Sequence, residues 1–188
     1  MLIEQIRHFD WYNEPQDFNL IEEGLLIKTA PQTDFWQNSD RGFTKDNGHL
    51  FSQKKSGDFT LIVKWHFSLI RDSAQCGIMV RSDVQNWIKA GLLSQNPYHP
   101  QIGVVVAASG ASDWSIVELP RTCRDLWFKL RRRGKDFVVW YGLDDQNFKQ
   151  IRLIHLSKAL PTIDAGAYAC SPKEETFECL LEQIEFKI

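Results

Sequence analysis

The sequence lacks the paired cysteine and histidine motifs that mark metal and redox sites. Its four cysteines form no C-x-x-C pair, and its five histidines show no H-x-H or H-x-x-x-H spacing. These absences argue against zinc knuckles and thioredoxin-like redox motifs. Each cysteine lies in or near an apolar run, which favours buried free thiols over disulfides. We therefore predict no metal site and no cofactor.

Long apolar stretches and an excess of positive charge are also missing. No stretch approaches the ~20 apolar residues of a membrane span, and the N-terminal residues lack the apolar segment of a secretory signal. The formal net charge is −2, from 22 basic and 24 acidic side chains. Proteins that bind nucleic acids or membrane surfaces carry a marked basic excess. We expect a cytoplasmic protein with neither nucleic-acid nor membrane partners.

The chain is rich in short apolar segments with a period of two. Between residues 59 and 67 every odd position is apolar or aromatic. About a dozen such segments follow one another at roughly 8–12-residue spacing, with turn residues between them and no long helical pattern. This organisation is typical of an all-β sandwich or barrel. A length of 188 residues fits one domain that spans residues 1–188.

Residues 76–92 predict two antiparallel strands with two different faces, because successive side chains of a strand alternate. One face is purely apolar. The other carries functional groups: Met79, Arg81, Trp87 and Lys89. Two cations beside tryptophans, on strands that are otherwise apolar, need either an anionic partner or a set of carboxylates.

Seven short motifs occur in an order and spacing that resemble a known family. They are Asn13–Pro15, Thr33–Trp36, Asp46–His49, Gly77–Arg81, Trp87–Gly91, Ser112–Ser115 and Ala169–Pro172. Together they resemble, over about residues 9–188, the DUF1349 or regulation-of-enolase-protein-1 family of the concanavalin A-like lectin/glucanase superfamily. The resemblance implies a two-sheet antiparallel jelly-roll sandwich with a concave face.

In such a sandwich, sugars lie across the concave sheet. They need planar aromatic side chains for the apolar faces of the ring and polar groups for the hydroxyls. We predict that one such face collects the ligand-binding residues Trp36, Met79, Arg81, Trp87, Lys89, Trp114 and Arg131. The three cations would suit an anionic ligand, for example a phosphorylated one. The alternative is that the tryptophans are core residues and the charges form a solvated sheet face.

Catalysis has less support in the sequence. The family pattern runs on to a glutamate after the Trp87–Gly91 motif, where this chain has two leucines, and the E-x-D-x-x-E segment of the superfamily's retaining glucanases is absent. Glycoside hydrolysis needs two carboxylates about 5–10 Å apart. The candidates for acid–base roles are Glu118, Asp34 and His49, from separate segments; such a histidine can equally fix a turn.

Three functions stay open at this point. The favoured one is a lectin-like module that binds a carbohydrate or another small polyol without catalysis. The others are a glycoside-acting enzyme and a regulatory protein–protein interaction module. A homodimer through edge strands is compatible with all three.

Overall fold

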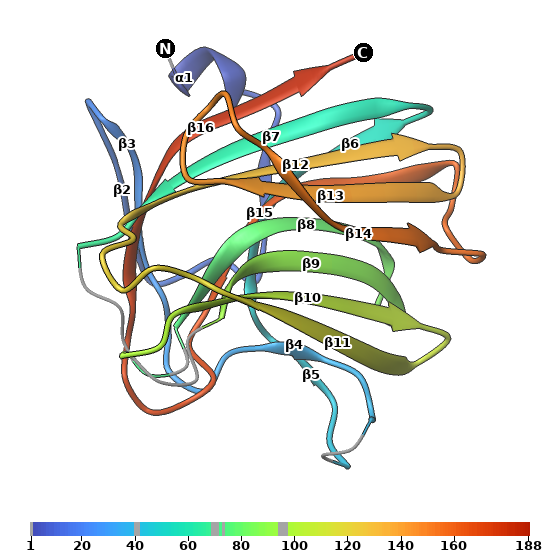
Figure 1. The fold of residues 1–188 in the computed structure, drawn as a ribbon, viewed down its shortest axis with the longest axis horizontal. Helices are drawn as coiled ribbons and strands as arrows, with labels where there is room; N and C mark the ends of the chain where they lie inside the picture. The colour runs from blue at the N-terminus through green and yellow to red at the C-terminus, as the bar shows by residue number, and fades with distance from the viewer. Residues whose placement is uncertain (1, 40–41, 69–71, 73, 94–97) are drawn as a thin grey trace.

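The computed structural model describes residues 2–39, 42–68, 72, 74–93 and 98–188. Two seven-stranded antiparallel sheets pack face to face as a jelly-roll sandwich, and a small two-stranded sheet lies beside one of them (Figure 1). Helix α1 (Leu2–Gln5) is short. Within the described ranges no helix has the length and apolarity needed to cross a membrane. The predicted all-β sandwich is confirmed.

The first large sheet, sheet A, carries the concave face. Its strands follow the spatial order β1 (Asp10–Tyr12), β6 (His49–Ser56), β15 (Thr162–Cys170), β8 (Gln75–Asp83), β9 (Asn86–Leu93), β10 (Gln101–Ala108) and β11 (Ala111–Glu118). The predicted strand pair in residues 76–92 is therefore β8 and β9, close to the middle of this sheet.

The second large sheet, sheet B, backs the first. Its strands follow the order β14 (Lys149–His155), β13 (Asp136–Gly142), β12 (Asp125–Arg133), β7 (Phe59–His66), β16 (Glu178–Lys187), β3 (Gly24–Lys28) and β2 (Asp17–Ile21). The small sheet pairs β4 (Phe35–Trp36) with β5 (Lys45–Asp46).

The main core lies between the two sheets and follows from the period-two pattern. Burial alternates along the whole of β7, with Phe59 to Trp65 inward at odd positions. The Trp65 indole also donates a hydrogen bond of 3.0 Å to the Gly77 carbonyl of sheet A. All four cysteines are buried free thiols, as predicted, and burial raises the pKa of Cys123 to about 11.

Strands β8, β9 and β10 are buried on both faces, because a second apolar cluster forms on the side of sheet A that faces away from sheet B. Its members come from the sheet and from the small β4–β5 sheet: Phe35, Trp36, Leu50, Met79, Trp87, Val105, Ala107, Tyr168 and Cys170. This second layer explains why the central strands read as nearly continuous apolar runs.

Glycines let two large rings approach the backbone of this face. Gly91 and Gly103 pair with each other across β9 and β10. A side chain at Gly91 would begin only 2.6 Å from the Tyr168 hydroxyl, and one at Gly103 only 3.2 Å from the Trp114 indole nitrogen. Both positions therefore serve close approach by an aromatic ring rather than a turn.

Candidate functional site

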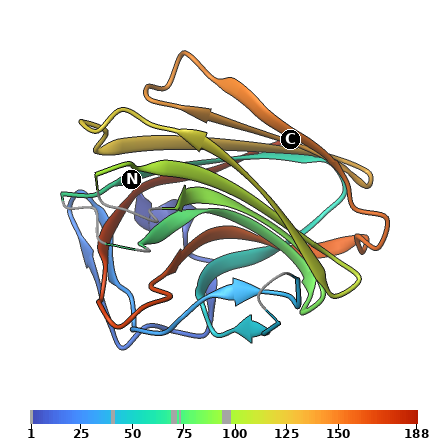
Figure 2. The same ribbon diagram turned by 60° about the horizontal axis from the view of Figure 1, so that its bottom comes forward.

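The concave face of sheet A is divided into a covered part and an open part. Strands β4 and β5 lie against the inside of the curved sheet (Figure 2). We refer to residues 33–39 and 42–48, which include these strands, as the cover. The covered part contains Arg81 and Lys89, and the open part contains Trp114.

Lys89 is paired inside the fold. Its side chain is 1% exposed, and its Nζ donates to Asp34 Oδ1 of the cover at 2.6 Å and to Gln75 Oε1 at 2.9 Å. The ammonium also lies 5.9 Å and 5.6 Å from the ring centroids of Trp87 and Tyr168. Its charge is therefore neutralised by the cover, and the side chain offers no open surface to a ligand.

Arg81 makes a second ionic contact to the cover. Its Nη2 donates to Asp46 Oδ2 at 2.9 Å and to the Tyr12 hydroxyl at 3.2 Å, and its guanidinium carbon lies 4.2 Å from the Tyr12 ring centroid. The Tyr12 hydroxyl donates to the same carboxylate at 2.6 Å. Partial burial and this hydrogen bond to Asp46 raise the pKa of Tyr12.

Apolar and backbone contacts hold the cover between these two ion pairs. Phe35 is fully buried and meets Trp87 edge-on at 6.3 Å between centroids. Farther along, the Ser112 N–H of β11 donates to the Gln37 carbonyl at 3.1 Å. A side chain at Gly48 would begin 2.5 Å from the Phe35 ring. The Asn47-Gly48 sequence thus permits close packing of the cover.

His49 has a structural role in this arrangement. The Ala30 N–H donates to its Nε2 at 3.0 Å, which leaves Nδ1 as the protonated nitrogen that donates to the Asn13 carbonyl at 2.7 Å. Burial lowers the pKa of His49, and the hydrogen bond to Asn13 opposes that effect in part. The ring is held neutral between two backbone segments. The structure therefore supports the turn-fixing alternative over acid–base catalysis.

The open part is a strip along β10 and β11 that begins past the contact between Ser112 and Gln37 of the cover. Here Trp114 is half-buried and packs against the second cluster, while Ile116 is 49% exposed and Glu118 is exposed. Gln101 is the direct partner of Glu118. The Gln101 Oε1 atom is buried and makes no hydrogen bond within the described ranges. We call Gln101, Trp114, Ile116 and Glu118 the open strip.

The prediction for Arg131 is wrong. Arg131 lies on β12 of sheet B, between Thr60 and Val138, and faces outward. Its guanidinium carbon lies 5.3 Å from the Trp140 ring centroid. The alternation along residues 126–133 is as expected, but this strand belongs to the other sheet, so Arg131 cannot join Arg81 and Lys89.

The remaining predictions separate into two groups. Met79, Arg81, Trp87, Lys89 and Trp114 do share one face of sheet A, and Trp36 lies on the cover above it. Met79 and Trp87 are fully buried and Trp36 nearly so, so these three form the contact between sheet and cover. Among the predicted residues on this face, Trp114 and Glu118 reach the open part.

Sequence reasoning missed the cover as an element, together with Tyr168 and Gln101. Tyr168 alternates with small residues in β15 and fills the space over Gly91. The signal that a large ring crosses the strands was a pair of glycines at equivalent places, Gly77 in β8 and Gly91 in β9. No local signal shows that residues 33–39 and 42–48 fold back over the sheet.

The arrangement offers little for acid–base chemistry. Asp34 is engaged by Lys89 and by the Phe35 N–H at 2.8 Å, and His49 is held neutral. Glu118 is exposed on an edge strand. None of the three candidates is arranged as an acid–base pair.

Comparison with known proteins gives the family. The sequence profile of DUF1349, described as a protein of unknown function, matches residues 11–188. This chain belongs to the DUF1349 family. It is 30% identical over 166 residues to Regulation of enolase protein 1 of Saccharomyces cerevisiae, which corresponds to 87% of this chain and 81% of that protein.

Solved structures confirm the jelly-roll sandwich. A functionally unknown protein from Saccharomyces cerevisiae superposes with a TM-score of 0.89 at 25% identity, over 97% of both chains. The carbohydrate-binding module CBM66 from Bacillus subtilis superposes with a TM-score of 0.62 at 14% identity, over 95% of both chains. Larger GH43 proteins also match at 13–16% identity, and the chain spans 24–38% of each of them. This fold is therefore shared with a carbohydrate-binding module and with parts of glycoside hydrolases.

Proposed function

We propose that this protein is a non-catalytic cytoplasmic module that binds a neutral carbohydrate or polyol on the open strip of sheet A. The observation that carries the proposal is the position of Trp114. Its half-buried indole lies over Gly103 and packs against the second cluster, on the same strand as the exposed Ile116. A half-buried indole suits the apolar face of a sugar ring.

Polar groups beside the indole complete the proposed site. The Gln101 Oε1 atom is a buried acceptor without a hydrogen bond in the described ranges, and its cross-strand partner Glu118 is exposed. A buried acceptor without a partner is costly, so a ligand hydroxyl would contribute favourably there. Ile116 supplies adjacent apolar surface.

The charges favour a neutral ligand over the anionic one considered from the sequence. Lys89 and Arg81 are already paired with carboxylates of the cover, and Arg131 faces outward from sheet B. The open strip itself contributes one acidic side chain, Glu118. A phosphorylated ligand would find no unpaired cation among the four residues of the strip.

A glycan array, followed by calorimetric titration of each hit, tests the proposal. The variant Trp114→Ala should abolish binding because the stacking surface is lost. The matched control is Trp140→Ala, which removes another half-buried indole from the outer face of sheet B. Absence of any glycan response, or equal losses in both variants, would contradict the proposal. Circular dichroism would confirm that both variants remain folded.

A second candidate function is regulatory protein binding. It is favoured by the name of the yeast relative and by the edge strand β2, where Phe18, Leu20 and Ile21 are between 36% and 45% exposed. An exposed apolar edge is a template for pairing with another chain. A titration with purified enolase, and sedimentation of the protein alone, would separate enolase binding from a homodimer. Leu20→Lys should abolish whichever contact uses this edge.

A further inference from the structure

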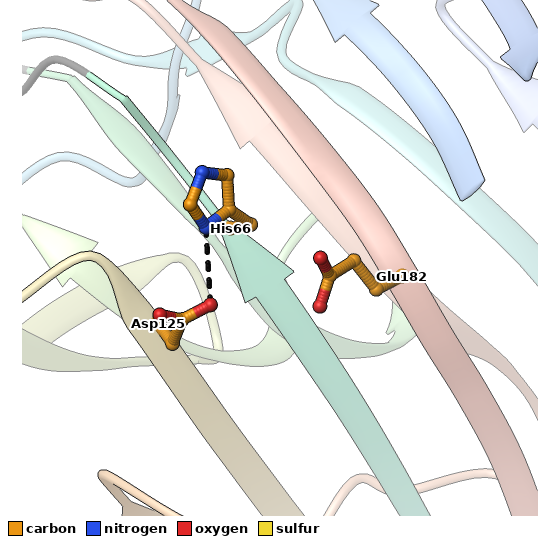
Figure 3. Close-up of side chains that lie close together, drawn as sticks. All are labelled: His66, Asp125 and Glu182. Atoms are coloured by element: carbon orange, nitrogen blue, oxygen red, sulfur yellow. Dashed lines mark hydrogen bonds and ion pairs between the residues drawn. The ribbon is translucent and has the colours of Figure 1, made fainter. Parts of the chain in front are cut away.

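Three potential metal ligands lie together on the outer face of sheet B. His66, Asp125 and Glu182 come from adjacent strands β7, β12 and β16 and point toward one another (Figure 3). One ligand atom from each lies within 4.8 Å of the others, and His66 Nδ1 is 3.0 Å from Asp125 Oδ1. All three side chains are partly exposed, so the cluster is open to solvent on the side opposite the concave face.

The fold brings the third ligand into place with a local irregularity. His66 and Asp125 are direct cross-strand partners. In β16 the register shifts between Leu181 and Gln183, so that Glu182 is an extra residue and its carboxylate turns toward the pair. Such β-bulges change the direction in which a side chain points, and they are common near functional sites. Gly24 accommodates the bulge, because a side chain there would begin 2.3 Å from the Leu181 carbonyl oxygen.

We infer that His66, Asp125 and Glu182 form a binding site for a divalent transition-metal ion, with Zn²⁺ as the best-matched ion. One imidazole nitrogen and two carboxylate oxygens are ligands that Zn²⁺ accepts, and three protein ligands leave a fourth position for water. The imidazole disfavours Mg²⁺ and Ca²⁺, which prefer oxygen ligands throughout. A bound ion would join three neighbouring strands of sheet B.

Lys64 is the internal competitor for this site. Its ammonium forms an ion pair with Glu182 Oε2. The same ammonium lies 5.5 Å from the Trp127 ring centroid, so it has a second favourable contact if a metal takes the carboxylate. Removal of the ammonium should therefore strengthen metal binding.

The chain contains a matched control for the histidine. His155 Nδ1 lies 2.7 Å from Asp136 Oδ1 in the same sheet, which reproduces the His66–Asp125 pair. Within the described ranges, the cluster at His66 is the one group of three or more candidate ligands. His155→Ala thus removes a histidine–aspartate pair without touching the proposed site.

The test is calorimetric titration of the untagged full chain with ZnCl₂, with Co²⁺ absorption as an independent readout. We expect one ion per chain. His66→Ala and Glu182→Gln should each weaken binding at least about tenfold, since even outer-shell partners of metal ligands are typically worth about 10- to 100-fold. His155→Ala should leave binding unchanged, and Lys64→Met should tighten it.

The opposite results would overturn the inference. If wild type and His66→Ala bound Zn²⁺ equally strongly, any ion would sit elsewhere. The same would follow if His155→Ala weakened binding as much as His66→Ala does. The same conclusion would follow if no Zn²⁺ bound to wild type or to Lys64→Met, because the latter lacks the competing cation. Far-ultraviolet circular dichroism of each variant would confirm that a loss of binding is not a loss of fold.

Discussion

The covered and open parts share one face of sheet A but lie on different strands. In the covered part, Lys89 and Arg81 meet carboxylates of the cover and are shielded from water. In the open strip, two strands away from Lys89, Trp114 is half-buried and Glu118 is exposed. The comparison teaches that charged and aromatic side chains on a concave sheet do not by themselves identify the ligand surface.

The cover lies against the inside of the curved sheet, over its middle strands. It supplies two carboxylates for the two cations, and it places the Phe35 ring against Trp87. The chemical expectation from the sequence was that these cations need an anionic partner or a set of carboxylates. The carboxylates come from the chain itself, from residues about 35–55 positions earlier.

The largest predicted effect concerns the buried ion pair of the covered part. Asp34→Ala leaves the Lys89 ammonium buried with Gln75 as its remaining hydrogen-bond partner among the described residues. Loss of one member of a buried pair typically costs about 3–5 kcal/mol. Urea unfolding should show this loss. Asp164→Ala, which removes the partly exposed partner of the exposed Lys54, should cost about 1 kcal/mol or less. Equal losses would show that the cover is not held by Asp34.

A pH dependence should come from His49, at the edge of the covered part. Burial lowers the pKa of His49 below the ordinary value of 6.5. At a pH between the two pKa values the ring is protonated in the unfolded chain and neutral in the folded chain. Stability contributed by the neutral ring is present above about pH 6.5 and is lost as the pH falls through the folded-state pKa. Urea unfolding between pH 7.5 and 5.5 should show a shallower decline for His49→Gln than for wild type. If wild type and His49→Gln lost the same stability over this pH range, His49 would not be the cause of the pH dependence.

The smallest effect belongs to the open strip. Glu118→Ala removes an exposed carboxylate that the fold does not use as a buried partner, so the free energy of unfolding should change by about 0.5 kcal/mol or less. Glycan binding should nevertheless weaken, because a polar contact to the ligand is lost. A large loss of stability would mean that the strip, like the covered part, is part of the core.

The sequence predicted most of the fold and only part of the site, for physical reasons. Period-two alternation depends on local geometry, so the faces of β8, β9 and β12 followed directly from residues 76–92 and 126–133. The sheet to which a strand belongs depends on distant pairing, which is why Arg131 was placed on the wrong face. Lys89 is paired with Asp34, which lies 55 residues away in the sequence, and no local pattern reveals such a contact.

The most direct test of the two-part face uses the indole N–H signals of the seven tryptophans in ¹H–¹⁵N spectra, assigned through single Trp→Phe variants. During titration with a glycan identified on the array, the Trp114 signal should shift most. The signals of Trp36 in the cover, of Trp87 beneath it, and of Trp140 on sheet B should stay in place. Shifts centred on Trp36 and Trp87, with Trp114 unchanged, would contradict the account and make the covered part the binding site.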